Sequence, residues 1–487
     1  MSTSLPIYDQ NIDTVEKKEK CGLFGIWGTE QASRVTYQGL FAQQHRGQES
    51  AGIAVRKRDG ELNGHAGMGL VSQVFKNGRL FEEELAGHAA IGHVRYSTTG
   101  SSEVCNAQPI LQRYHLGPVA LAHNGNLVNG EVLRRQYEEH GHIFQSTTDT
   151  EIIVHLLAKP SHASKADPLP HVLKHLQGAY ALLFLFPDRI ECVRDPWGIR
   201  PLSIGKLPGG EWVVASETCA FDAINATFVR DVEPGEIVCL NDEGMSSRCF
   251  IEPAEKRAQC VFEHVYFANP ASRVFGQNVH VVRERMGRQL ARESAVEADI
   301  VIPMPDSGRS AALGYSKESG IEFEEGIVPN RFVGRTFILP DQVARDAAVA
   351  LKLNVIEELV RGKRVIVVDD SIVRGTTTRS KMRALRRAGA KEIHLRISCP
   401  PIRHPCFYGI DFATKKELIA DGRSVEQIQN FLEVDSLAYL SLEGTVACSK
   451  VESDHACTAC WTGEYKVPID EATAKFNFER DQLRMFK

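Results

Sequence analysis

The decisive stretch of this sequence reads Val365-Ile-Val-Val-Asp-Asp-Ser-Ile-Val-Arg-Gly-Thr-Thr-Thr-Arg379. Its first four residues are all β-branched, which is typical of a strand buried on both faces of a parallel sheet. Two aspartates follow where that strand should end, and then a short polar loop contains a single glycine, Gly375. From Thr377 the apolar residues recur at helical spacing up to Gly389, a suitable stop. The pattern predicts a strand, a loop and a helix of an open α/β sheet, which binds ligands at this edge.

The residue types of this loop indicate the kind of ligand. Backbone N–H groups around Gly375, the threonine hydroxyls that follow and a helix N-terminus together form a cradle for an anion. The adjacent carboxylates of Asp369 and Asp370 would repel a phosphate, but they suit sugar hydroxyls or a magnesium ion. A ligand with a phosphate, a diol and a bound metal ion matches both the anion cradle and the pair of carboxylates. Taken singly, each residue also fits an ordinary buried strand that ends in a turn, so the prediction depends on the complete run.

The complete run resembles the phosphoribosylpyrophosphate (PRPP) signature of the type I phosphoribosyltransferases. The resemblance implies that the acidic pair binds the ribose hydroxyls and that the loop holds the 5-phosphate. It is not a Walker loop, because no Gly-Lys-Ser/Thr follows the glycine. The PRPP-binding residues that it implies here are Asp369, Asp370, Ser371, Arg374, Gly375, Thr376, Thr377 and Thr378.

Composition describes an ordinary globular protein that is long enough for two or three domains. The 487 residues are 43% hydrophobic and 24% charged, with a net charge of −5, so we expect no nucleic-acid partner. No apolar run reaches the roughly 20 residues that a membrane helix requires, so we expect no membrane partner. The first twenty residues are polar and carry no apolar signal region, which predicts a cytoplasmic protein. Its twelve cysteines would then be reduced, and a few of them would serve in catalysis or metal binding.

The first ordered element is predicted to begin at Cys21, in Cys21-Gly-Leu-Phe-Gly-Ile-Trp-Gly28. If residues 1–20 are a leader that is removed, Cys21 gains a free α-amine. Its reference pKa of about 7.7–8.0 lies close to the thiol's value of about 8.5, so proton transfer between them costs only about 1 kcal/mol. An N-terminal cysteine therefore carries its own general base.

The residues after Cys21 predict a β-rich α/β pattern. The expected strands are the one at Cys21 and those near 51–55, 88–94, 119–123, 180–186 and 212–215. The expected helices lie near 33–45, 131–140, 150–157 and 170–176.

Three further stretches offer the groups that a free amino acid substrate needs. Arg95 lies at a strand end and Asp149 precedes a helix. Arg95 suits binding of the substrate's anionic group, and Asp149 suits binding of its cationic group. Asn124 and Gly125 offer an amide side chain and a flexible backbone N–H, which are suitable oxyanion donors. Each motif alone also fits a solvated or capping residue.

In this order the motifs resemble the glutaminase domain of the N-terminal-nucleophile amidotransferases, over about residues 21–250. The resemblance implies that Cys21 is the nucleophile, that Asn124 and Gly125 form the oxyanion hole, and that Arg95 and Asp149 bind glutamine. In this chain a leader must be cut to expose the cysteine, whereas some relatives lose only the initiator methionine.

Composition shifts near residues 252–257, which predicts a domain boundary there. The predicted division is a leader at 1–20, a glutaminase domain at 21–253 and a phosphoribosyltransferase domain at 254–487. Ser307 follows a second strand-like run at 301–304, and Arg331 and Arg335 lie on a loop with a glycine hinge. Two arginines on a movable loop suit closure over a pyrophosphate, although a solvated basic loop fits as well when it is taken alone.

With both halves, the chain after residue 20 resembles the glutamine PRPP amidotransferases. That family makes phosphoribosylamine, the first committed step of purine synthesis. The resemblance implies a Mg²⁺ site at Ser307, Asp369 and Asp370, closure of Arg331 and Arg335 over PRPP, a homotetramer, and inhibition by purine nucleotides. Glucosamine-6-phosphate synthase shares only the glutaminase half and lacks the decisive stretch. A non-catalytic PRPP-sensing regulator remains the alternative, although the basic DNA-binding segment that it needs is absent.

Four cysteines form a separate set, which consists of a C-x-x-C pair and two distant members. Their spacing leaves a zinc site, a redox pair and an iron–sulfur site open. The resemblance favours a 4Fe-4S cluster, because the positions match the cluster-bearing members of the family, with zinc as the second choice. The four are Cys260, Cys406, Cys457 and Cys460. The others are expected to be ordinary core or surface residues: Cys105, Cys192, Cys219, Cys239, Cys249, Cys399 and Cys448.

Overall fold

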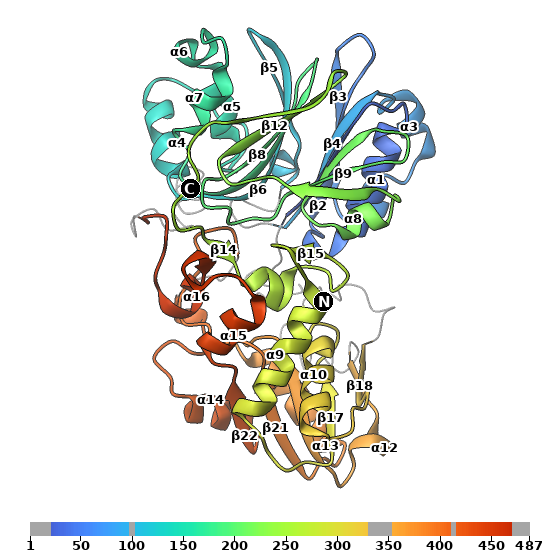
Figure 1. Cartoon of the computed structure of the whole chain (residues 1–487), viewed down its shortest axis with the longest axis vertical. Helices are drawn as coiled ribbons and strands as arrows, with labels where there is room; N and C mark the ends of the chain where they lie inside the picture. The colour runs from blue at the N-terminus through green and yellow to red at the C-terminus, as the bar shows by residue number, and fades with distance from the viewer. Residues whose placement is uncertain (1–20, 97–102, 330–352, 411–414, 470–487) are drawn as a thin grey trace, which may run out of the picture. The chain divides into compact units, whose positions relative to one another are not determined.

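The computed structural model describes residues 21–96, 103–329, 353–410 and 415–469 (Figure 1). The predicted leader at 1–20 and the loop residues Arg331 and Arg335 lie outside the described residues. The chain forms two compact units. The smaller unit contains Met286–Pro401 and Ile419–Ser441, and the described part of the larger unit lies within 21–285, 402–418 and 442–469.

The smaller unit is built on a parallel four-stranded sheet in the order β17-β20-β21-β22. Its strands are β17 (Ile300–Pro303), β20 (Arg364–Asp369), β21 (Glu392–Ile397) and β22 (Ser436–Tyr439). The side chains of Val365 to Val368 are all fully buried, as the uninterrupted β-branched run predicted. Because strands β17 and β20 are parallel neighbours, the loops after them meet at one edge of the sheet.

Helices and a pair of short antiparallel strands accompany the sheet of the smaller unit. Helix α13 begins at Thr376, one residue before the predicted start, and ends at Arg387, two residues before Gly389. Helix α10 packs on β17 and β20. The remaining elements are α10 (Arg309–Ser319), α12 (Glu357–Val360), α14 (Val425–Leu432), β18 (Ile327–Pro329) and β19 (Leu353–Val355), while α9 (Val279–Glu293) runs across the boundary between the units.

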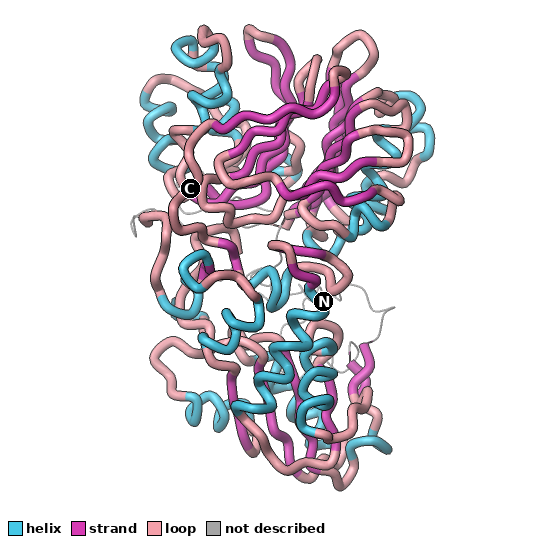
Figure 2. The backbone as a smooth tube through the Cα atoms, viewed as in Figure 1, coloured by secondary structure: helices cyan, strands magenta, loops and turns pink. Residues whose placement is uncertain are grey.

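The larger unit contains two antiparallel sheets (Figure 2). The seven-stranded sheet has the order β11-β9-β10-β1-β4-β2-β3, and the six-stranded sheet has the order β13-β12-β8-β7-β6-β5. The strands of the first are β1 (Gly22–Trp27), β2 (Ser50–Arg56), β3 (Leu62–Met68), β4 (Ala89–Arg95), β9 (Ser203–Lys206), β10 (Trp212–Ala215) and β11 (Thr227–Asp231). The strands of the second are β5 (Ile110–Tyr114), β6 (Gly117–Leu127), β7 (Gly178–Leu185), β8 (Ile190–Arg194), β12 (Glu236–Asn241) and β13 (Gly244–Cys249).

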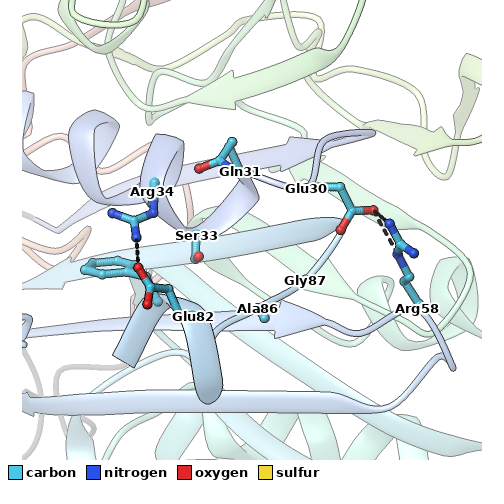
Figure 3. A pocket seen from close by; sticks show the side chains of 9 residues that line it. Glu30, Gln31, Ser33, Arg34, Arg58, Glu82, Ala86 and Gly87 are labelled. Carbon is cyan, nitrogen blue, oxygen red and sulfur yellow. Dashed lines mark hydrogen bonds and ion pairs between the residues drawn. The ribbon is translucent and has the colours of Figure 1, made fainter. Parts of the chain in front are cut away.

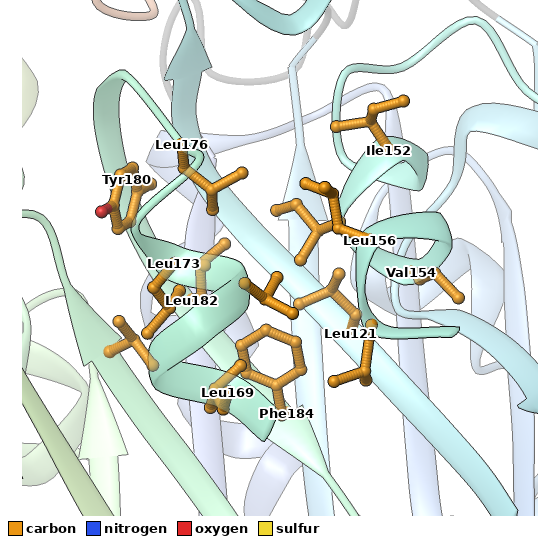
Figure 4. Close-up of a cluster of buried hydrophobic side chains, with 14 of the residues drawn as sticks. Leu121, Ile152, Val154, Leu156, Leu169, Leu173, Leu176, Tyr180, Leu182 and Phe184 are labelled. Carbon is orange, nitrogen blue, oxygen red and sulfur yellow. The ribbon is translucent and has the colours of Figure 1, made fainter. Parts of the chain in front are cut away.

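Apolar cores stabilise this unit, which has layers of helix, sheet, sheet and helix. One core lies between the sheets and contains Leu23 and Leu183. A second lies between the seven-stranded sheet and α1, around Phe24 and Leu40. The third packs α5 and α7 on the six-stranded sheet (Figure 4). The helices are α1 (Ala32–Ala42), α2 (Val71–Val74), α3 (Gly78–Glu83), α4 (Gly130–Glu139), α5 (Glu151–Ala158), α6 (Pro160–Ala163), α7 (Pro168–Leu173) and α8 (Cys219–Asp222).

Short elements bring the C-terminal part of the chain back to the larger unit. Strands β14 (Gln259–Cys260) and β23 (Ala456–Cys457) pair in parallel. The others are β15 (Arg273–Val274), β16 (Gln277–Asn278), α15 (Leu442–Ser449) and α16 (Ala459–Thr462). None of the helices in the described ranges combines the length and hydropathy needed to cross a bilayer.

Candidate active sites

Cys21 lies immediately before β1, a central strand of the seven-stranded sheet, and its side chain is 7% exposed. Its thiol donates to the backbone carbonyl of Tyr96 at 3.8 Å. Burial raises the pKa of this thiol, while the Tyr96 contact and the positive charges of Arg95 and Arg46 act in the opposite direction. The thiol is therefore protonated at neutral pH in this setting and needs a base before it can attack a carbonyl.

A buried guanidinium, that of Arg46, binds the backbone at Cys21. Its Nε donates to the carbonyl oxygen of Cys21 at 3.0 Å. Its other nitrogens pair with the carboxylate of Glu217 and, at 3.1 Å, with both carboxylate oxygens of Glu263. None of these three roles was predicted, because a buried ion pair between residues so far apart in the chain leaves no pattern in the sequence.

The predicted oxyanion residues lie on β6, and a serine connects them to the strand that follows Cys21. The Asn124 side-chain amide donates to Ser216 Oγ at 3.4 Å, and the Leu23 N–H donates to the same oxygen at 3.0 Å. Gly125 has φ +150°, and a Cβ atom there would lie 1.9 Å from the Ala179 carbonyl oxygen. Only glycine fits at this point, because a larger residue would meet the Ala179 backbone.

Arg95 and Asp149 are both buried and are held by different strands. Arg95 ends β4, and its Nη1 lies 3.4 Å from the Glu49 carboxylate. Asp149 precedes α5 and accepts from the Leu127 N–H on β6 at 2.7 Å. Burial raises the pKa of Asp149, but His123, whose Nδ1 lies 3.7 Å away, and several hydrogen bonds outweigh burial and lower it. Arg95 is thus close enough to Cys21 to act on the pKa of its thiol, and the Asp149 carboxylate lies beside β6.

The decisive stretch forms an oxygen-rich cluster in the smaller unit. Asp369 ends β20, and its Oδ1 accepts from the Asp370 N–H at 2.9 Å. Ser307, from the loop after the neighbouring strand β17, donates to Asp370 Oδ1 at 2.6 Å, and Ser371 donates to Asp370 Oδ2 at 2.5 Å. The structure therefore brings together the residues that the resemblance assigned to magnesium and to the ribose. Oxygen donors of this kind are the ligands that Mg²⁺ prefers.

The loop that follows supplies an anion-binding geometry. Gly375 precedes α13 with φ +77°, and a Cβ atom there would lie 2.4 Å from Ile419 Cδ1. Thr376 and Thr377 are exposed at the helix N-terminus, Thr378 is buried, and Arg374 is half-buried. Exposed hydroxyls beside free helix N–H groups suit a phosphate.

The four candidate ligand cysteines all lie in the larger unit. Cys260 and Cys457 are directly opposite each other on β14 and β23. The backbone N–H of Tyr408 donates to Cys406 Sγ at 3.4 Å. The Cys460 carbonyl accepts from the backbone N–H groups of Arg403 and His404, which lie three and two residues before Cys406. Burial raises the pKa of Cys260 to about 12, with a smaller contribution from Cys406. Across the part of the chain that the structure describes, no group of three or more His, Cys, Asp or Glu side chains is arranged to hold a metal ion.

A surface hollow of about 490 Å³ lies apart from all these residues (Figure 3). It is bordered by two ion pairs, Arg34 with Glu82 and Arg58 with Glu30, each at 3.0 Å. Its charges of both signs are already paired and exposed, so it offers no group for catalysis.

Two family models match the chain in the order that the motifs predicted. A glutamine amidotransferase domain matches residues 93–223, and a phosphoribosyl transferase domain matches residues 287–409. The amidophosphoribosyltransferase of Bacillus subtilis is 49% identical over 461 residues, which are 93% of this chain and 96% of that protein. The one of Methanothermobacter thermautotrophicus is 48% identical and covers 96% of this chain and 99% of its own. This chain belongs to the amidophosphoribosyltransferase family.

Solved structures agree with this membership. A structure described as the allosteric regulatory enzyme of purine biosynthesis matches with a TM-score of 0.88 at 48% identity, over 93% of this chain and 98% of that one. The B. subtilis glutamine PRPP amidotransferase, solved in complex with ADP and GMP, matches with a TM-score of 0.87 at 48% identity over the same shares.

As an amidophosphoribosyltransferase, the chain is an enzyme that carries out glutamine-dependent amidotransfer to PRPP in purine biosynthesis. The predicted family, fold class and activity are confirmed. The non-catalytic PRPP-sensing regulator is no longer a competing hypothesis.

Proposed function

We propose that the two reactions of this enzyme use the residues assigned from the sequence. In the first, the Cys21 thiolate attacks the amide carbon of glutamine, and the resulting oxyanion accepts hydrogen bonds from the Asn124 side chain and the Gly125 N–H. Ammonia leaves, and water then releases glutamate from the thioester. The observation that carries this proposal is the shared acceptor, Ser216 Oγ, which lies within hydrogen-bond reach of both Asn124 and the strand that begins after Cys21.

The base in this scheme is the α-amine of Cys21, released when residues 1–20 are removed. An amine with a pKa of about 7.7–8.0 is partly neutral at physiological pH and lies on the same residue as the thiol. In the uncut chain that nitrogen is an amide and cannot accept the proton. Processing of the leader is therefore required for glutamine-dependent activity.

Arg95 and Asp149 bind the α-carboxylate and the α-amine of glutamine. Asp149 suits this role because its lowered pKa keeps it anionic at every physiological pH. Because both side chains are buried, each ion pair with the substrate is stronger than it would be in water.

In the second reaction, ammonia displaces pyrophosphate from C1 of PRPP to give 5-phosphoribosylamine. Asp369 and Asp370 accept from the ribose hydroxyls, and the loop of Ser371, Arg374, Gly375, Thr376, Thr377 and Thr378 holds the 5-phosphate. Mg²⁺ would be held through Ser307, Asp369 and Asp370, and it neutralises charge on the departing pyrophosphate when it is bound. Arg331 and Arg335 close over the same group. Ammonia must remain unprotonated, so it passes between the two reactions without release to bulk water.

Cys260, Cys406, Cys457 and Cys460 are proposed to hold a 4Fe-4S cluster. Two observations support this proposal: Cys260 lies opposite Cys457 on paired strands, and Cys406 is close enough to Cys260 to contribute to its raised pKa. Burial raises the pKa of Cys260 and of Cys457, and bound iron would stabilise their thiolate forms. Zinc is the alternative, since it takes the same four ligands.

Regulation, assembly and location are proposed from the family. The nucleotides in the B. subtilis complex support inhibition of this enzyme by purine nucleotides. A homotetramer and the functional division at 1–20, 21–253 and 254–487 follow from the resemblance. A cytoplasmic location is supported by the polar first twenty residues, which carry no apolar signal region.

The test is pyrophosphate release measured with glutamine or with ammonium at alkaline pH as the nitrogen source. Cys21→Ser should lose glutamine-dependent release by at least about 10³-fold, because a serine hydroxyl is too weak an acid for this base. Its ammonium-dependent release should persist. The double variant Asp369→Asn/Asp370→Asn should lose both, since both routes end at PRPP.

Intact mass of the active wild-type protein provides the control for processing, and it should correspond to a chain that begins at Cys21. Full glutamine-dependent activity with Lys20 attached would contradict the processing proposal. Loss of the ammonium route in a folded Cys21→Ser variant would contradict the assignment of Cys21 to glutamine chemistry.

A further inference from the structure

A short segment near the four cysteines, Phe407–Gly409, contacts the oxyanion strand of the larger unit. The Asn126 side-chain amide donates to the Phe407 carbonyl at 2.9 Å, across 281 residues of sequence. Asn126 directly follows Gly125 on β6, so this bond fixes the strand next to the predicted oxyanion N–H. The match to the phosphoribosyl transferase domain ends at Gly409, yet this segment packs with the larger unit.

Gly409 lies so close to the Gly125 backbone that a residue with a side chain would not fit at position 409. A Cβ atom on Gly409 would lie 2.9 Å from both the carbonyl carbon and the carbonyl oxygen of Gly125, and 3.2 Å from its Cα. The opposing atoms belong to backbone, so they cannot swing aside as a flexible side chain would. On its own side, Gly125 is confined by the Ala179 carbonyl on β7. The Gly125 residue is thus held between two backbones.

The segment itself is held firmly by Tyr408. Its side chain is 1% exposed, and its hydroxyl donates to the Val467 carbonyl at 3.0 Å and accepts from the Val467 N–H at 2.9 Å. Its carbonyl accepts from the buried Arg200 guanidinium, which also lies 3.3 Å from Glu263. Glu263 in turn pairs with Arg46, the residue that donates to the Cys21 carbonyl. One buried network of hydrogen bonds and ion pairs therefore connects the segment with Cys21.

We propose that Phe407–Gly409 is a positioning element for the oxyanion hole. Its close contact with the Gly125 backbone and its hydrogen bond with Asn126 fix the orientation of the Gly125 N–H. The inference rests on the proposed roles of Asn124 and Gly125. An oxyanion donor acts on the transition state rather than on bound substrate. A disturbed segment should therefore lower kcat for glutamine hydrolysis and leave KM for glutamine nearly unchanged.

The decisive variant is Gly409→Ala, and the chain offers a matched control. Gly210 has φ +104°, close to the +99° of Gly409, and a Cβ atom there meets nothing within 4 Å. Gly210→Ala therefore carries the same backbone strain without the contact at Gly125. We expect Gly409→Ala to lower kcat for glutamine hydrolysis by about tenfold or more, with KM within about twofold. Gly210→Ala should leave both unchanged.

Two further readouts separate an oxyanion effect from a general disturbance. Alkylation of Cys21 by iodoacetamide needs the thiolate but no oxyanion hole, so its rate should be the same in Gly409→Ala and wild type. Pyrophosphate release with ammonium should also persist. If Gly409→Ala does not fold, Asn126→Ala removes the bond to Phe407 without adding atoms, and it should lower kcat in the same selective way.

The outcomes distinguish this inference from the proposal beneath it, with Asn124→Ala as the reference variant. If Asn124→Ala lowers kcat but Gly409→Ala and Asn126→Ala do not, the positioning role is wrong and the oxyanion assignment stands. If none of the three lowers kcat, the oxyanion assignment itself is wrong. A rise in KM at constant kcat, or slower alkylation of Cys21, would also overturn the inference.

Discussion

A buried thiol is a poor nucleophile until a base removes its proton, and Cys21 is such a thiol. Burial raises its pKa, so the cost of transferring its proton to the α-amine exceeds the value of about 1 kcal/mol for the two groups in water. The guanidinium groups of Arg95 and Arg46 reduce that cost, because a thiolate is attracted to both. Arg95 therefore favours the thiolate form of Cys21, in addition to its proposed role in binding glutamine.

His93 gives a prediction for the pH dependence of stability. It is fully buried on β4, and its Nε2 lies 3.0 Å from the His123 carbonyl. Burial and the nearby charge of Arg95 lower its pKa to about 3. Between pH 6.5 and 3 the unfolded chain binds a proton at this residue and the folded chain does not. Folding stability should therefore fall as pH decreases through this range, by up to about 1.4 kcal/mol per pH unit from this group.

The variant His93→Gln removes this proton uptake, so its free energy of unfolding should depend less steeply on pH between 6.5 and 5. Urea unfolding at several pH values, followed by tryptophan fluorescence, measures the difference. All four tryptophans, Trp27, Trp197, Trp212 and Trp461, belong to the larger unit, so the signal reports that unit alone. Parallel pH profiles for variant and wild type would show that His93 is not responsible.

Individual residues could be predicted where they belong to a local run and not where they act through a partner far along the chain. Asp369, Asp370 and Gly375 belong to one continuous stretch from the end of β20 to the start of α13, and the structure places them as the run predicted. Arg46 and Ser216 carry no local signal, because each becomes significant only through contacts with residues more than 20 positions away.

At the scale of elements, the turn from β20 into α13 gives a second prediction. Gly375 combines φ +77° with a close approach to Ile419. Gly375→Ala should move the start of α13 and raise KM for PRPP by about tenfold or more, since small displacements of a binding loop are costly. Both nitrogen routes should be affected equally, because both use PRPP.

Gly320 provides the matched control for this variant. It follows α10 in the same unit with φ +73°, and a Cβ atom there meets nothing within 4 Å. Gly320→Ala should cost about 1–2 kcal/mol of stability through backbone strain, with KM for PRPP unchanged. If both variants raise KM alike, the effect comes from stability and not from the loop.

Some apolar strands were predicted from the sequence, whereas others, such as β8 and β12, were missed although their residues are largely buried. The strand over 365–368 and those near 51–55 and 88–94 were predicted because their side chains are buried on both faces. Strand β3 was missed because it is an edge strand with no fully buried residue, so its sequence shows no core-facing alternation. Strand β11 was missed for the same reason.

At the scale of the whole molecule, the chain crosses between its compact units more than once. Residues 402–418 belong to the larger unit although β22 of the smaller unit follows them in the sequence, and residues 442–469 belong to the larger unit again. Such a path cannot be read from composition, because packing between distant segments decides it. It also explains why the proposed cluster ligands, which lie far apart in the sequence, all belong to one unit.

The last prediction concerns those ligands. A cluster held by Cys260, Cys406, Cys457 and Cys460 would cross-link three distant segments of the larger unit, so its loss should destabilise that unit. Anaerobically purified protein should contain about four irons per chain, as a 4Fe-4S cluster requires. Cys457→Ser should lose iron and lower the thermal midpoint of tryptophan fluorescence, whereas Cys105→Ser, which changes an exposed cysteine, should do neither. Exposure of the wild type to oxygen should reproduce the Cys457→Ser midpoint. Stoichiometric zinc without iron would replace the iron–sulfur assignment with the zinc alternative, and unchanged iron content in Cys457→Ser would show that this residue is not a ligand.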